Sequence, residues 1–199
     1  MNKKLAIPIP VLIVVIITIL VTTLIMNNNK EKLTDPNLNN QGVETMEKAA
    51  VVYFSRTNNT ERIAEIIAEK TGADLYEIEA KTPYTDDDIN WHDDNSRANR
   101  EQNDDSARPE IANIPDVSEY DTIYLGYPIW WGTMPKIMNT FVETGALNGK
   151  RIVAFCTSGS SGIETSVSAL KNYGLDVIGG QRFSSSVTES EVESWLEEL

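Results

Sequence analysis

The sequence predicts an α/β protein of the doubly wound sandwich type, in which a five-stranded parallel sheet carries helices on both faces. Short apolar or β-branched runs alternate with helical segments from about residue 48 to the end of the chain, which is the pattern of repeated βαβ units. Polar, glycine and tryptophan residues gather directly after several of these runs. Sheets of this kind bind ligands at the carboxyl ends of their strands, so a ligand site is expected there.

Each expected strand is a short run bounded by turn residues. Three of the five are continuous apolar or β-branched segments, as in strands buried on both faces, whereas the second alternates and the fifth is less apolar. The five ranges are 49–54, 73–79, 122–127, 151–157 and 176–183.

The expected helices show an apolar stripe at helical spacing. In the first of them Ile63, Ile66 and Ile67 share a face, and Gly72 provides a stop signal. The ranges are 60–71, 136–144, 162–173 and 189–199.

The N-terminal part of the chain predicts a membrane anchor. From Leu5 to Met26 the chain carries no charged residue, which is long enough for a helix that spans a bilayer. A cleaved signal peptide would also begin with lysines, but no small-residue cleavage site follows the apolar run. The expected divisions are a short basic N-terminus at 1–4, a transmembrane anchor at 5–26, a flexible polar linker at 27–47 and a globular domain at 48–199.

Charge near the anchor favours a single-pass protein whose N-terminus is inside and whose domain lies on the extracytoplasmic side. Lysines flank both ends of the anchor, and only the terminal amine favours this orientation. The tripeptide Asn58-Asn59-Thr60 is also a formal glycosylation sequon. Because a glycan there would block the turn that contains it, we expect a bacterial or archaeal protein.

Composition excludes some partners. The formal net charge of -13 makes nucleic acid an unsuitable partner, since phosphate backbones require a basic surface. An acidic surface could steer a basic protein toward this one, or it could serve solubility alone. Cys156 and His92 are the only residues of their kinds, so neither a disulfide within the chain nor a cysteine-based metal site is expected.

The turn after the first strand, Ser55-Arg56-Thr57-Asn58-Asn59-Thr60, is rich in hydroxyl and amide groups and leads into a helix. It has neither the lysine of a P-loop nor the spaced glycines of a dinucleotide fingerprint, which disfavours a nucleoside triphosphate and NAD. Hydroxyls and backbone N–H groups at a helix start suit a phosphate monoester. The same residues could also form a plain N-capped turn.

Two further loops follow the third and fourth strands. The first, from Gly126 to Pro135, contains Trp130 and Trp131, which could form a flat wall for a planar aromatic ligand or serve core packing or a protein interface. The second, from Thr157 to Gly162, could let backbone approach a ligand closely or could be a simple strand-to-helix connection. The occurrence of all three loops at strand ends favours a ligand site.

On these residues the chain resembles the flavodoxin family over about residues 48–199, in particular its short-chain branch with a tryptophan-rich second loop. The first loop of that family typically reads Ser/Thr-x-Thr-Gly-x-Thr, and Ser55, Thr57, Asn59 and Thr60 match it. Asn58 stands where the family usually has glycine. Asparagine is the other residue that best tolerates a left-handed backbone, so the match is little weakened.

The resemblance implies a flavodoxin-like sheet of strand order 2-1-3-4-5 and FMN as a non-covalent cofactor. The phosphate would lie in the first loop, and the second and third loops would line the flavin ring, with no catalytic acid, base or nucleophile and no metal. The residues expected to bind FMN are Ser55, Thr57, Asn58, Asn59, Thr60, Pro128, Ile129, Trp130, Trp131, Gly132, Thr157, Ser158, Gly159, Ser160 and Gly162.

Related proteins also carry a long segment after the second strand, here from Pro83 to Glu110. Between Lys81 and Glu110 it has nine acidic and four basic residues, and it contains Trp91. We expect it to cover the flavin side as a loop with a short helix, although a merely solvated insertion is the alternative.

The first hypothesis for function is an FMN-dependent electron-transfer protein, tethered to a membrane and working with separate redox partner proteins that could carry basic docking surfaces. One alternative is an FMN-dependent NAD(P)H or quinone reductase on the same fold. Another is a flavodoxin-like binding module that has lost its flavin, because fold does not guarantee function.

Overall fold

The computed structural model describes residues 47–199 of the chain. Their centre is one five-stranded sheet of order β2-β1-β3-β4-β5 in which all neighbouring strands are parallel. This confirms the sheet and the strand order expected from the sequence. The strands are β1 (Ala49–Tyr53), β2 (Asp74–Glu77), β3 (Thr122–Pro128), β4 (Arg151–Thr157) and β5 (Asp176–Phe183).

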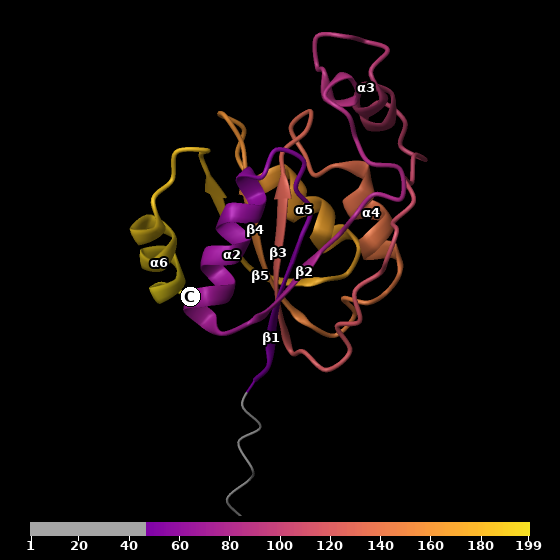
Figure 1. Ribbon diagram of the computed structural model, residues 1–199. Coiled ribbons are helices and arrows are strands. Elements are labelled where there is room, and N and C mark those ends of the chain that lie inside the picture. Colours follow the sequence, from indigo (N-terminus) through magenta and orange to yellow (C-terminus); the bar gives the residue numbers. More distant parts are fainter. Residues whose placement is uncertain (1–46) are drawn as a thin grey trace, which may run out of the picture. The chain divides into compact units, whose positions relative to one another are not determined.

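Helices cover both faces of the sheet, with α2 and α6 on one face and α4 and α5 on the other (Figure 1). The short elements η2 and α3 lie in the long segment between β2 and β3. The helical elements are α2 (Asn59–Thr71), η2 (Asp87–Ile89), α3 (Arg97–Gln102), α4 (Lys136–Glu143), α5 (Glu164–Asn172) and α6 (Glu189–Glu197).

Two apolar clusters fill the layers between sheet and helices. On one face, Phe141 of α4 lies among residues of β1, β3 and β4, and on the other face Ile63 and Ile67 of α2 pack with Phe155 and Trp195. Burial on both faces explains why β1, β3 and β4 are continuous apolar runs. Each face is stabilised by the removal of apolar area from water.

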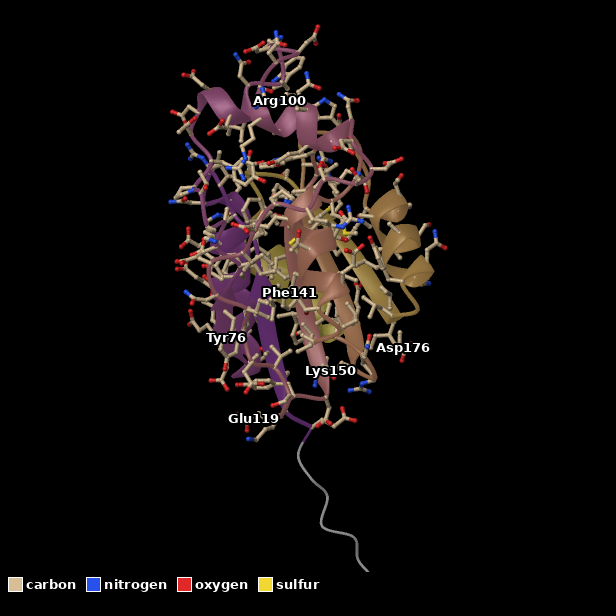
Figure 2. The ribbon with its side chains drawn as sticks, turned by 90° about the vertical axis from the view of Figure 1, so that its right-hand side faces the viewer. Tyr76, Arg100, Glu119, Phe141, Lys150 and Asp176 are labelled. Carbon is tan, nitrogen blue, oxygen red and sulfur yellow. The ribbon has the colours of Figure 1, made fainter. Side chains whose placement is uncertain are left out.

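The domain has two opposite ends, one at each edge of the sheet. Figure 2 shows Arg100 of α3 at one end, whereas Glu119 and Lys150 lie at the opposite end. At that opposite end the Lys150 ammonium donates to the carbonyl oxygen of Tyr120 at 2.6 Å, and the Tyr120 hydroxyl donates to Asp74 at 2.7 Å. These contacts lie at the amino-terminal edge of the sheet, and its carboxyl edge faces the end of the domain that carries α3.

The predicted membrane anchor at 5–26 and the linker to residue 46 lie outside the described residues. Between residues 47 and 199 no helix combines the length and the apolar character that a bilayer crossing requires.

Candidate functional site

Three loops meet at the carboxyl edge of the sheet, and Thr157 at the end of β4 joins them. Its hydroxyl lies 2.8 Å from that of Thr60 in the first turn of α2, and its carbonyl oxygen accepts the Ile129 amide at 2.9 Å. Both threonines are buried. The predicted first, second and third loops therefore lie next to one another at this edge of the sheet.

The first loop presents unpaired backbone donors at the start of α2. Asn58 precedes the helix in the left-handed conformation (φ 59°), without a capping bond from its side chain. Within residues 47–199, the amide hydrogens of Arg56, Thr57 and Asn58 meet no backbone acceptor. A helix start with free N–H groups attracts an anion, so the loop has the donors that a phosphate needs.

Ser55 adds a buried hydroxyl to these donors. Its Oγ is enclosed, and no hydrogen-bond partner for it exists among the described residues. A buried hydroxyl without a partner costs free energy, and a phosphate oxygen would satisfy it. The neighbouring Arg56 is paired with Asp86 of the long segment at 2.6 Å, which ties the first loop to that segment.

The second loop turns sharply at Trp131 and Gly132. Trp130 and Thr133 exchange backbone hydrogen bonds of 2.9 and 3.1 Å across the turn, and both central residues have positive φ, 50° and 81°. Positive φ at both positions is typical of a type I′ turn, which a tryptophan adopts only under constraint. The tight turn displays the Trp131 side chain at the tip of the loop.

The two tryptophans of this loop have different surroundings. The Trp130 ring packs edge-to-face against Phe54 at 5.6 Å and against Tyr84 at 5.2 Å, at the margin of the core. The Trp131 side chain is 41% exposed. Trp130 therefore anchors the loop to the core, whereas the exposed Trp131 side chain is free to cover a planar ligand.

The segment between β2 and β3 supports the second loop through Gln102 at the end of α3. The Gln102 carboxamide donates to the carbonyl oxygens of Trp130 at 3.0 Å and Met134 at 3.3 Å, and it accepts the amide of Lys136 at 2.9 Å. Arg97 of α3 stacks on the Tyr84 ring, 3.9 Å from its centroid. Burial, reinforced by a hydrogen bond to Glu101, raises the pKa of Tyr84 above its ordinary value.

A cavity of about 370 Å³ lies between this segment, the second loop and the third loop. Trp91, which is 68% exposed, and Trp131 both line it. Its size and its apolar walls suit a planar aromatic ring. The lining residues are Ile89, Trp91, Ile129, Trp130, Trp131, Gly132 and Ser161.

The third loop contributes backbone more than side chains. The Ser158 hydroxyl is already bound to the carbonyl oxygen of Ser161, whereas Gly159 and Ser160 are exposed. A side chain at Gly159 would meet nothing within 4 Å, so this glycine leaves open space beside the loop. The backbone here is accessible to a ligand.

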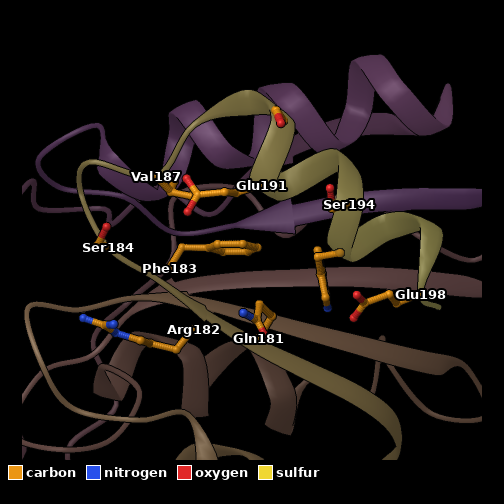
Figure 3. A pocket seen from close by; sticks show the side chains of 10 residues that line it. Gln181, Arg182, Phe183, Ser184, Val187, Glu191, Ser194 and Glu198 are labelled. Carbon is orange, nitrogen blue, oxygen red and sulfur yellow. The ribbon is translucent and has the colours of Figure 1, made fainter.

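Another hollow, of about 410 Å³, lies between β5 and α6 (Figure 3). Phe183, Glu191 and Glu198 are among its lining residues, and none of the residues predicted to bind FMN lines it. Across residues 47–199 no group of three or more histidine, cysteine or acidic side chains could hold a metal ion.

Comparison with known proteins places this arrangement in a family. The family model described as Flavodoxin matches residues 48–199, the whole α/β domain. The chain belongs to the flavodoxin family. This confirms the resemblance to flavodoxins that was inferred from the three loop motifs.

Solved structures of similar flavodoxin-like proteins come from two Bacteroides species. A protein of Bacteroides eggerthii DSM 20697 described as a flavoprotein is 40% identical, with a TM-score of 0.71 over 76% of this chain and 96% of that chain. Another from Bacteroides uniformis ATCC 8492 is 39% identical, with a TM-score of 0.72 over 76% and 98% of the two chains.

Two further relatives are more distant. A flavoprotein of Lactobacillus acidophilus NCFM in complex with FMN is 24% identical, with a TM-score of 0.53 over 75% of this chain and 99% of that one. At that identity the likeness shows the fold alone. An NAD(P)H dehydrogenase (quinone) of Acidovorax ebreus is 28% identical over 152 residues, which are 67% of this flavodoxin chain and 70% of the relative.

The structure brings the predicted site residues of this flavodoxin domain to one edge of the sheet, although their contacts with FMN stay predictions. Sequence reasoning did not single out Ile89, Gln102 and Ser161. Ser161 lay inside the predicted third loop, but no local pattern distinguishes Ile89 or Gln102, because their role comes from the path of a segment distant in sequence.

Proposed function

We propose that residues 48–199 bind FMN and transfer electrons to and from separate partner proteins. FMN is the expected cofactor of this family, and a protein of the same fold from Lactobacillus acidophilus NCFM is described in complex with it. The observation that carries the proposal is the buried, unpartnered hydroxyl of Ser55. It belongs to the first loop, whose amides are free and which meets the third loop at the Thr60–Thr157 pair. The third loop in turn borders the cavity lined by Trp91, Trp130 and Trp131, hereafter the tryptophan-walled cavity.

The first loop would hold the FMN phosphate. The Ser55 hydroxyl and the amides of Arg56, Thr57 and Asn58 are donors without protein acceptors among the described residues. The Thr57 hydroxyl accepts a bond of 3.0 Å from the Asn59 carboxamide, which leaves the Thr57 proton free to be donated. A nest of neutral donors at a helix start stabilises a dianion without a full positive charge.

The cavity beside Trp131 would hold the flavin ring. Bound FMN would supply the redox chemistry, while the protein would position the ring and set its electrostatic surroundings. Trp131 and Trp91 would shield the faces of the ring, and the third loop would lie along its edge. The acidic segment from Lys81 to Glu110 would give partner proteins with basic surfaces an electrostatic attraction.

A titration of the purified protein with FMN tests this proposal. Quenching of flavin fluorescence with saturation at one FMN per chain is expected, whereas riboflavin, which lacks the phosphate, should bind at least tenfold more weakly. The variant Ser55→Ala should lose roughly ten- to a hundredfold in affinity for FMN and little for riboflavin, because one charge-assisted bond contributes about 1.5–3 kcal/mol. Absence of FMN binding would favour the flavin-free binding module.

A second candidate function is an FMN-dependent NAD(P)H or quinone reductase. The relative from Acidovorax ebreus is described as an NAD(P)H dehydrogenase (quinone) and aligns with 67% of this chain. The FMN-loaded protein should then oxidise NAD(P)H with saturation in the presence of a quinone and without any partner protein. Slow, unsaturable oxidation would leave electron transfer between proteins as the function.

We further propose that residues 5–26 anchor the domain to a bacterial or archaeal membrane, with the domain on the extracytoplasmic side. The support is the uncharged run from Leu5 to Met26 together with the lysines before it. Protease added to intact cells should remove the domain if this orientation holds. Protection of the domain until the cells are broken would place it inside.

A further inference from the structure

Arg182 of β5 holds the backbone of the third loop from outside the loop. Its guanidinium donates to the carbonyl oxygen of Ser158 at 2.9 Å, to that of Gly159 at 2.6 Å and to the Ser158 hydroxyl at 3.1 Å. Figure 3 shows Arg182 and Phe183 on opposite sides of the strand. Phe183 packs toward α6, whereas Arg182 reaches the loop that follows β4.

These bonds fix the direction of two peptide groups. In a trans peptide the C=O and the N–H point in opposite directions, so carbonyls turned toward Arg182 turn the amides of Gly159 and Ser160 away from it. Neither amide donates to any protein acceptor within residues 47–199. The loop continues to Ser161, which lines the tryptophan-walled cavity. Two free donors of fixed direction therefore stand next to that cavity.

We propose that Arg182 is a positioning residue that aims the Gly159 and Ser160 amides at the pyrimidine edge of the flavin. The inference rests on the proposed binding of FMN. The pyrimidine edge carries two carbonyl oxygens and a ring nitrogen that act as acceptors, and negative charge accumulates there when the flavin is reduced. Fixed amide donors bind such a charge more strongly than the neutral oxidised ring. Arg182 thereby strengthens binding of reduced FMN relative to oxidised FMN and raises the midpoint potential.

Arg182 could act through its positive charge or through the hydrogen bonds that position the third loop, and two variants distinguish these roles. Arg182→Lys keeps the positive charge but loses the fork that spans two carbonyls and a hydroxyl, and Arg182→Gln loses both. Arg62 gives a matched control, because its guanidinium also donates to two loop carbonyls, those of Val187 at 2.9 Å and Ser185 at 3.3 Å. That loop lies between β5 and α6 and does not line the tryptophan-walled cavity.

The experiment measures the dissociation constants of oxidised and reduced FMN and the midpoint potential of the bound flavin, with circular dichroism to verify the fold. Positioning predicts that both Arg182 variants bind reduced FMN about tenfold more weakly relative to oxidised FMN. Tenfold corresponds to a decrease of about 30 mV for a two-electron couple. Arg62→Gln should leave the ratio of the two affinities, reduced over oxidised FMN, within about twofold of the wild-type ratio.

Three results would overturn the role of Arg182. An unchanged ratio in both variants would mean that the loop needs no clamp. If Arg182→Lys keeps the wild-type preference for reduced over oxidised FMN and Arg182→Gln loses it, the effect comes from charge alone. An equal decrease in Arg62→Gln would assign it to the loss of any nearby cation. If the wild-type protein binds no FMN, the proposed function fails first and the inference fails with it.

Discussion

The side-chain oxygens of Thr60 and Thr157 lie 2.8 Å apart in the protein interior, although 97 positions separate the two residues. Thr60 belongs to α2 and Thr157 ends β4, so the bond joins the first and third loops of the site. One hydroxyl of such a pair donates to the other, and the second keeps its own proton.

Replacement of either threonine by valine should destabilise the protein. Each single variant leaves the remaining hydroxyl buried without its partner, so the free energy of unfolding should fall by about 1–3 kcal/mol. The double variant Thr60→Val/Thr157→Val should lose less than the sum of the two single variants, because no unpaired hydroxyl remains. Urea unfolding without flavin measures all three. Strict additivity would show that the two hydroxyls do not interact.

The two tryptophans of the second loop should have separable roles. Trp131→Ala should weaken FMN binding tenfold or more and leave the free energy of unfolding nearly unchanged, because the side chain is 41% exposed. Trp130→Ala should lower the free energy of unfolding by about 3 kcal/mol through lost contacts with Phe54 and Tyr84. Fluorescence titration and urea unfolding of both variants test this. The reverse assignment of effects would contradict it.

The fold could be predicted from the sequence because its signals are local. Three of the five strands are continuous apolar or β-branched runs. Four of the five helices of more than a single turn begin and end within two residues of the expected limits. For example, the stripe of Ile63, Ile66 and Ile67 before Gly72 defines α2. Because ligand loops follow strand ends in this type of sheet, the first, second and third loops could also be located.

The details of the site could not be predicted, because they depend on contacts between distant segments. The sequence gives no reason to separate Trp130 from Trp131, since their exposure follows from a turn with positive φ at its tip. Gln102 and Arg182 hold the second and third loops from elements outside them. Thr60 could be expected to bind phosphate from its place at a helix start, but its bond to Thr157 depends on the tertiary fold.

Asn58 should tolerate glycine but not a β-branched residue. Its φ of 59° lies in the left-handed region, which costs most L residues about 1–2 kcal/mol and is worst for branched side chains. Asn58→Gly should therefore bind FMN as the wild type does, with the free energy of unfolding changed by less than about 1 kcal/mol. Asn58→Val should lose about 2 kcal/mol. Equal stability of the two variants would show that the loop relaxes to another conformation.

Gly126 should resist substitution because the ring of Phe155 covers it. A Cβ at position 126 would lie 2.2 Å from the Phe155 ring, and overpacking of this kind costs about 1–3 kcal/mol. Gly126→Ala should therefore lower the unfolding midpoint in urea, and the cost should shrink in a Phe155→Leu background, where the ring is absent. An undiminished cost in that background would assign the effect to the backbone rather than to the ring.

The Cys156 thiol should be inert in the folded protein. Burial raises its pKa from 9.0 to about 12, although Arg182 opposes this shift. At pH 8 the thiolate fraction should thus be about a thousandfold lower in the folded than in the unfolded state, and the thiolate is the reactive form. A thiol reagent should label the urea-unfolded protein rapidly and the native protein at the rate of unfolding. Fast native labelling would show that the fold opens locally at β4.

The raised pKa of Cys156 should also make the free energy of unfolding decrease at alkaline pH. Above pH 9 the unfolded chain loses the thiol proton while the folded protein keeps it until about pH 12. The unfolded state is therefore favoured progressively as pH rises through this window, and the free energy of unfolding should decrease. Cys156→Ser removes the titrating thiol, so this variant should show a shallower decrease between pH 9 and pH 11. Parallel curves for the two proteins would mean that tyrosine or lysine titration dominates the alkaline limb.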